Sequence, residues 1–83
     1  MPVLIMFRSL TFAQRGAREL ERFGIFASVI KAPLRATDMG CSYCIRISES
    51  RLKASLTVLK ERGLAYGRVL RVGEDGEYRE VEV

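Results

Sequence analysis

The chain has 83 residues, 48% of them hydrophobic and 29% charged, which is the composition of one small globular domain. No apolar run approaches the roughly 20 residues that span a bilayer, and residues 2–7 lack the basic lead-in and cleavage site of a signal peptide, so we expect a cytoplasmic protein with no membrane partner. The absence of histidine excludes Ser-His-Asp and Cys-His catalysis within one chain, as well as mixed Cys/His zinc sites.

The net charge of +4 is unevenly distributed. Residues 1–71 carry thirteen of the fourteen Lys/Arg and five of the ten Asp/Glu, a net +8, whereas residues 72–83 carry one Arg and five acids, a net −4. A positive body attracts anionic partners. A charge count of this size mostly describes solvated surface, however, so a nucleic-acid partner is not expected.

The first half of the chain predicts a strand, a helix and a second strand. Residues 3–7 are apolar and rich in strand-forming types, and Ser9 is a suitable helix cap. Gly24 is placed to end the helix in the left-handed conformation, and residues 26–30 follow as a strand. The predicted apolar face of the helix consists of Ala13, Gly16, Ala17, Leu20 and Phe23.

The second half repeats this order after a loop over residues 31–40. Residues 43–47 predict a third strand, Ser48 the start of a second helix, and Gly63 its end. Residues 65–72 predict a fourth strand, 74–76 a turn and 77–83 a short further strand. The predicted apolar face of the second helix consists of Leu52, Ser55, Leu56 and Leu59.

The two halves match at an offset of 39 residues. Ser9 corresponds to Ser48, Leu20 to Leu59, Gly24 to Gly63, Ile25 to Leu64 and Ile30 to Val69. Two strand–helix–strand units predict an α+β, ferredoxin-like βαββαβ sandwich, with a four-stranded antiparallel sheet and two helices on one face. We expect one domain over residues 1–83, with the acidic residues 72–83 forming a turn and an additional edge strand.

The same offset predicts which strand residues face the helices. It aligns Leu4 with Tyr43 and Met6 with Ile45, and these are expected under the helices. The opposite face would then carry Val3, Ile5 and Phe7, together with Cys44 and Arg46. We do not expect so apolar a face to be exposed to water. It should be covered either by a partner subunit in a homodimer or by the C-terminal segment.

Cys41 and Cys44 form a C-x-x-C pair where the long loop meets the third strand. This spacing suits a redox or transfer site, in which one thiolate attacks and the other resolves the product. It also suits a metal site, but two ligands are too few unless a dimer shares four cysteines. A sulfur carrier needs only one exposed thiol of low pKa, which holds a persulfide.

Cys41 is the preferred reactive thiol because Gly40, which precedes it, leaves the sulfur accessible. The cations Lys31, Arg35 and Arg46 are within a few residues of the loop and would lower its pKa if they converge on the thiol. Cys44, inside a strand, is either a resolving thiol or a small buried apolar residue. The predicted binding residues are Gly40, Ser42, Arg46 and Arg35, and no metal or cofactor is assigned.

The order of these features resembles a family of small bacterial proteins, the selenium/sulfur carrier-like family. The resemblance covers roughly residues 3–70 and depends on the Ala-rich helix opened by Ser9, on Gly24-Ile25, and on Gly40-Cys41-Ser42-Tyr43 before the third strand. It implies a thiol carrier of sulfane sulfur or selenium that works between donor and acceptor enzymes, with Cys41 in the family's cysteine position. Cys44 stands where many relatives have a small residue, so no family role transfers to it.

Two functions of different classes remain open at this stage. The first is a cytoplasmic carrier whose Cys41 accepts sulfur or selenium as a persulfide or its selenium analogue and passes it to an acceptor. The second is a ferredoxin-like regulatory or assembly module that binds a protein through its apolar sheet face, with incidental cysteines. Under either function we expect a carrier or a binding module rather than a self-sufficient enzyme.

Overall fold

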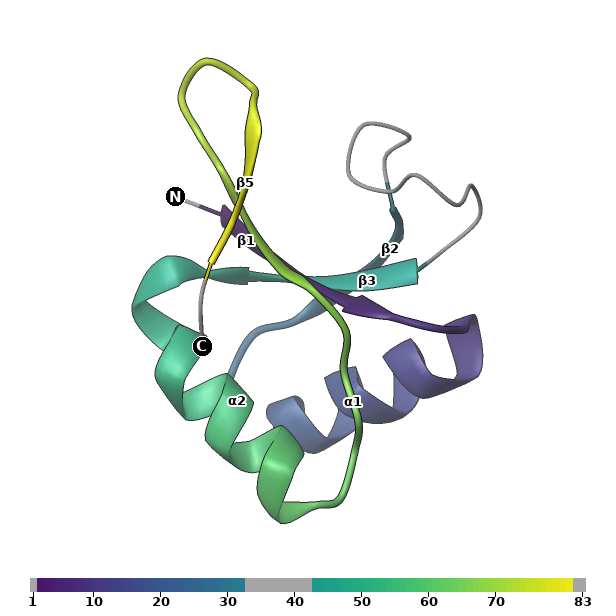
Figure 1. Cartoon of the computed structure of the whole chain (residues 1–83). Helices are drawn as coiled ribbons and strands as arrows, with labels where there is room; N and C mark the ends of the chain where they lie inside the picture. Colours follow the sequence, from purple (N-terminus) through teal and green to yellow (C-terminus); the bar gives the residue numbers. More distant parts are fainter. Residues whose placement is uncertain (1, 33–42, 82–83) are drawn as a thin grey trace.

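The computed structural model describes residues 2–32 and 43–81 of the chain. Two helices, α1 (Leu10–Arg22) and α2 (Leu52–Glu61), lie on one side of a five-stranded sheet (Figure 1). A 3-10 turn, η2 (Glu49–Arg51), leads into α2. The strands are β1 (Pro2–Phe7), β2 (Ser28–Lys31), β3 (Tyr43–Ser48), β4 (Val69–Val72) and β5 (Tyr78–Glu80).

The sheet has the strand order β2-β3-β1-β4-β5, and every neighbouring pair is antiparallel. The predicted α+β class, with two helices and an antiparallel sheet, is therefore confirmed. The sheet has five strands rather than the four predicted for its body, because β5 pairs with β4 and extends that edge. Gly76, at φ +79°, turns the chain between β4 and β5.

Both helices end in the same backbone motif. Gly24 and Gly63 have φ values of +76° and +69°. In α1, the N–H of Ile25 donates to the carbonyl of Leu20 at 3.0 Å, and Gly24 donates to Glu21 at 2.9 Å. The corresponding bonds in α2 run from Leu64 to Leu59 at 2.9 Å and from Gly63 to Lys60 at 3.1 Å. This is the Schellman arrangement, and it confirms the predicted helix ends.

The N-termini of the helices differ. The Ser9 hydroxyl accepts a bond from the N–H of Phe12 at 3.3 Å, so Ser9 caps α1 as predicted. Ser48 precedes η2 and makes no such bond with its side chain. The buried Ser55 instead donates its hydroxyl to the carbonyl of Arg51 at 2.7 Å, which satisfies a polar group under α2.

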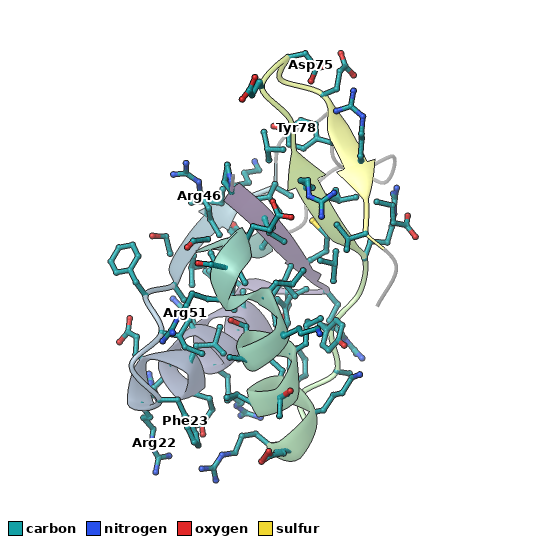
Figure 2. The ribbon with its side chains drawn as sticks, turned by 90° about the vertical axis from the view of Figure 1, so that its left-hand side faces the viewer. Arg22, Phe23, Arg46, Arg51, Asp75 and Tyr78 are labelled. Carbon is teal, nitrogen blue, oxygen red and sulfur yellow. The ribbon has the colours of Figure 1, made fainter. Side chains whose placement is uncertain are left out.

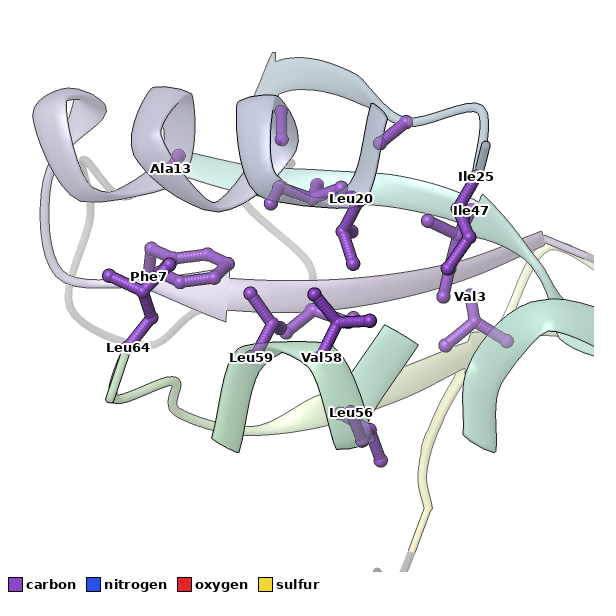
Figure 3. Packing of buried hydrophobic residues seen from close by; sticks show 14 of the residues in the cluster. Val3, Phe7, Ala13, Leu20, Ile25, Ile47, Leu56, Val58, Leu59 and Leu64 are labelled. Carbon is purple, nitrogen blue, oxygen red and sulfur yellow. The ribbon is translucent and has the colours of Figure 1, made fainter. Parts of the chain in front are cut away.

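The predicted faces of β1 are wrong, because Val3, Ile5 and Phe7 lie under the helices. The antiparallel register places these residues opposite Ile47, Ile45 and Tyr43, and residues directly opposite each other share a face of the sheet. Figure 3 shows Val3, Phe7 and Ile47 packed with Leu20 and Leu59 of the helices. Tyr43 and Ile45 were placed correctly.

The opposite face of the sheet forms a second, smaller core of Leu4, Met6, Ala32, Cys44 and Leu70. All five side chains are buried within a single chain. The C-terminal segment contributes Tyr78, which packs against this cluster together with Ile30 and Val72. These residues therefore need no second subunit to remove them from water.

Strand boundaries and two aromatic residues also differ from the predictions. Within the described residues, the strand predicted over 26–30 is Ser28–Lys31, and the strands predicted over 65–72 and 77–83 are found at Val69–Val72 and Tyr78–Glu80. Phe23, predicted on the apolar face of α1, is 50% exposed because it follows the last helical residue. Phe26 is 84% exposed, in the segment between α1 and β2.

The two Schellman glycines lead to a test of stability. We expect Gly24→Ala and Gly63→Ala each to lower the free energy of unfolding by about 1–2 kcal/mol, because an L side chain is strained at positive φ. Urea denaturation followed by circular dichroism measures this change. Gly67→Ala is the matched control, since an added Cβ there meets only ordinary contacts, the nearest being the Met6 carbonyl oxygen at 3.6 Å. An equal loss in the control would contradict the conformational explanation.

Candidate functional site

Only part of the predicted site falls within the described residues. Gly40, Cys41, Ser42 and Arg35 lie outside them, so their predicted roles stay predictions. Cys44 and Arg46 lie on β3, and Lys31 ends β2. The site is therefore built from the sheet residues around the point where the Gly40–Ser42 segment joins β3.

Cys44 has the surroundings of a small core residue. It pairs with Met6 of β1 on one side and Ile30 of β2 on the other, and its exposure is 0%. Burial raises the pKa of the Cys44 thiol from 9.0 to about 11. At neutral pH only about one molecule in ten thousand then carries the thiolate, which is the nucleophilic form.

We call residues 40–42, which contain Cys41, the cysteine segment. Tyr43 follows this segment directly in the chain and begins β3. It pairs with Phe7, the last residue of β1, and with Lys31, the last residue of β2. The chain entering β3 therefore meets the sheet where β1 and β2 end. Arg8 follows Phe7 directly, so two exposed cations, Lys31 and Arg8, flank this end of the sheet.

Lys31 was predicted near the reactive thiol from its position in sequence, but Arg8 was missed. The position of Arg8 beside Tyr43, the first residue of β3, follows from the antiparallel pairing of Phe7 with Tyr43, which local sequence does not indicate. The Arg8 guanidinium carbon lies 5.1 Å from the centre of the Phe12 ring, and that of Arg15 lies 6.0 Å from it. This end of the molecule is therefore positively charged beside the start of α1.

A pocket of about 320 Å³ opens beside Arg8. It lies between the end of β1 and the segment leading into β4, where the backbone of Gly67 donates to the Met6 carbonyl at 2.8 Å. The pocket is thus next to the strand end that pairs with Tyr43. Its lining residues are Met6, Phe7, Arg8, Ala65, Tyr66 and Gly67.

Arg46 lies away from this end of the sheet. It is three residues beyond Tyr43, which corresponds to about 10 Å along an extended strand. Its exposed side chain lines a different pocket, of about 270 Å³, at the other end of β3. That pocket is lined by Pro2, Phe26, Ser28, Arg46, Ile47 and Ser48. Within the described residues Arg46 is thus separated from Lys31 and Arg8.

Residues 2–32 and 43–81 contain no group of three or more Cys, Asp or Glu side chains that could hold a metal ion. Neither α1 nor α2 has the length and apolarity that crossing a bilayer requires.

Comparison with known families identifies the chain. The model of the family described as "Putative Se/S carrier protein-like" matches residues 3–71, which is most of the sequence. The chain belongs to this family, as the resemblance predicted. Neither the curated proteins nor the solved structures contain a match.

The burial of Cys44 predicts slow labelling of this thiol. In a Cys41→Ser variant, where Cys44 is the remaining cysteine, we expect a neutral-pH thiol reagent to react at least a hundredfold more slowly than with free cysteine. The rate should rise to that of free cysteine in denaturing urea. Fast labelling of the folded variant would show that Cys44 is accessible and reactive.

The raised pKa also predicts how stability depends on pH. A folded-state pKa of about 11 against 9.0 in the unfolded chain means that folding favours the protonated thiol, so its contribution is complete below pH 9 and is lost as pH rises towards 11. Because Tyr and Lys also titrate there, the comparison is with Cys44→Ala. Between pH 9 and pH 11, the free energy of unfolding measured by urea denaturation should fall by about 2 kcal/mol more for the wild type than for the variant. Parallel curves would contradict the assignment.

Proposed function

We propose that this protein is a small thiol carrier that holds sulfane sulfur or selenium on Cys41 and passes it between partner enzymes. Membership of the Se/S carrier-like family is the observation that carries the proposal. The surroundings of Cys44 support the choice of thiol, because the chain has two cysteines and one of them is buried and protonated. Cys41 is then the thiol that does the chemistry.

The proposed transfer is a pair of thiol–persulfide exchanges. The Cys41 thiolate attacks the outer sulfur of a donor persulfide, a new S–S bond forms on Cys41, and the donor leaves as a thiolate. An acceptor thiolate then attacks the outer sulfur of the Cys41 persulfide and restores the Cys41 thiolate. Neither step changes the net redox state, and selenium would follow the same course.

The positive charges at the end of the sheet where the cysteine segment joins β3 support a role for Cys41 as a thiolate. We propose that Lys31 and Arg8, which flank Tyr43 through strand pairing, lower the pKa of Cys41. The pocket beside Arg8 offers space for the end of a donor or acceptor chain that carries the sulfur. Arg46, at the other end of β3, is not included in this role. Gly40, Ser42 and Arg35 keep their predicted roles in binding.

Cys44 is proposed to serve packing rather than to resolve the persulfide. A buried thiol with a pKa of about 11 has little thiolate available for attack at neutral pH. The persulfide would then be discharged by the acceptor enzyme's own thiol. Such a carrier requires a reducing compartment, so the cytoplasm is the proposed location.

We also propose that β2-β3-β1-β4 is the ferredoxin-like arrangement of two split β-α-β units, with β5 added at one edge. The repeated Schellman ends of α1 and α2, at an offset of 39 residues, support an internally repeated βαββαβ unit.

Intact mass spectrometry tests the carrier proposal. After incubation with a cysteine desulfurase and cysteine, wild type should gain the mass of one sulfur, and dithiothreitol should remove it. Cys41→Ser should gain none, because the acceptor thiol is absent. Cys44→Ala, the matched control, should load as wild type does. Loading that persists in Cys41→Ser, or that disappears in Cys44→Ala while the fold is retained, would contradict the proposal.

A further inference from the structure

A second surface of the molecule combines exposed aromatic rings with arginines, at the end of the sheet opposite to Tyr43. Figure 2 shows Arg46, Arg51, Phe23 and Arg22 following one another along one side of the chain. We call this side the Phe/Arg surface. It consists of Arg22, Phe23, Phe26, Arg46, Arg51 and Arg62.

The two phenylalanines are far more exposed than is usual for large apolar side chains. Phe26 is 84% exposed and Phe23 is 50% exposed. Phe26 also forms one wall of the pocket of about 270 Å³, whose other apolar walls are Pro2 and Ile47. An exposed ring beside a partly apolar pocket is typical of a site that buries a partner's side chain.

The arginines bring positive charge to this surface. Two of its arginines share one carboxylate, that of Glu19, whose side chain is just 16% exposed and lies 3.2 Å from Arg22 and 3.3 Å from Arg62. Arg46 and Arg51 have no carboxylate within 4.0 Å among residues 2–32 and 43–81. Among the described residues, the Arg51 side chain donates one hydrogen bond, to the Gly24 carbonyl oxygen at 3.4 Å. Within the part of the chain that the structure describes, Arg46 and Arg51 are therefore available to the carboxylates of an anionic partner.

The type of side chain indicates a protein partner. All four cations of the surface are arginines, and arginine and phenylalanine are enriched in protein interfaces, whereas lysine is depleted there. Arg62 already lies over the Phe23 ring, at 5.2 Å from its centre, so cation and ring form one contact area. A second copy of the same surface is disfavoured because like charges would meet.

We propose that the Phe/Arg surface docks an acidic segment of a partner protein. An apolar side chain of that segment enters the pocket beside Phe26, and its carboxylates pair with Arg46 and Arg51. This inference goes beyond the carrier function and does not depend on Cys41. Because the pocket lies at the opposite end of β3 from Tyr43, a segment docked there leaves the end where the cysteine segment joins free.

Nuclear magnetic resonance titration of the ¹⁵N-labelled, 83-residue chain tests the surface under reducing conditions. The probes are the acidic peptide acetyl-DELFDE-amide and its neutral counterpart acetyl-NQLFNQ-amide. The acidic peptide should shift the amides of residues 23–28 and 46–51, and the neutral peptide should bind much more weakly. Absence of shifts in these residues, or equal binding of the two peptides, overturns the proposal.

Substitutions separate specific docking from general attraction between charges. Phe26→Ser and Arg46→Gln should each weaken binding of the acidic peptide roughly tenfold. Arg15→Gln removes the same charge on α1 beside Phe12, and it should change the affinity by less than about twofold. An equal loss in Arg15→Gln would mean that only net charge attracts the peptide, which overturns the proposal.

Two further measurements address other occupants. If oligothymidylate binds the same amides more tightly than the acidic peptide, the surface is a nucleic-acid site and the proposal is wrong. If sedimentation shows self-association that Phe26→Ser abolishes, the occupant is a second copy, which also overturns it. Persulfide loading of Cys41 is measured separately, so failure of docking is distinguishable from failure of the carrier function.

Discussion

Burial of β1 on both of its faces is the constraint on which the rest of the structure depends. Its five residues from Val3 to Phe7 are each 8% exposed or less. Three of them contact the helices and two contact the second core, so β1 belongs to both hydrophobic clusters. Pairing with β3 on one side and β4 on the other then fixes the register of the sheet. Because a slip of one residue would exchange the two faces, this register is strongly specified.

The same property explains why the helices could be predicted and the faces of β1 could not. Helix ends depend on local chemistry, and Ser9, Gly24 and Gly63 each satisfy terminal backbone groups within a few residues. A strand buried on both faces reads as a continuous apolar run, in which no alternation distinguishes one face from the other. Its faces depend on pairing with β3, which is distant in sequence.

The internal repeat was useful for the helices and misleading for the strands. The helix-ending glycines Gly24 and Gly63 are 39 residues apart, whereas inward-facing residues of β1 and β3, such as Ile5 and Ile45, are an even number of residues apart, here 40. The offset of 39 that aligns the helix ends is odd, so it aligns inward-facing residues of one strand with outward-facing residues of the other; in the second half the 3-10 turn η2 lies between the strand and the helix. A single offset cannot describe both elements, and a shift of one residue reverses the face of a strand.

The candidate site shows a similar division between local and tertiary information. Alternation along β3 placed Cys44 and Arg46 on the face away from the helices, and the structure agrees. That Cys44 is buried there depends on Leu4, Met6, Ala32 and Leu70, which come from separate parts of the chain. The presence of Arg8 beside the start of β3 likewise follows only from strand pairing.

These positions bear on how a carrier of this size would work. With Cys44 held as a buried thiol, a persulfide on Cys41 would have no readily ionised neighbour within its own C-x-x-C pair to release it. Burial of Cys44 would then have two consequences: the persulfide on Cys41 would be stored stably, and an external thiol would be needed to release it. The Phe/Arg surface lies at the other end of β3, so recognition of a partner and chemistry at the thiol would use different ends of one strand. Under the two proposals, such a separation would let a small domain remain docked to one protein while the end of the sheet at Tyr43 stays available to another.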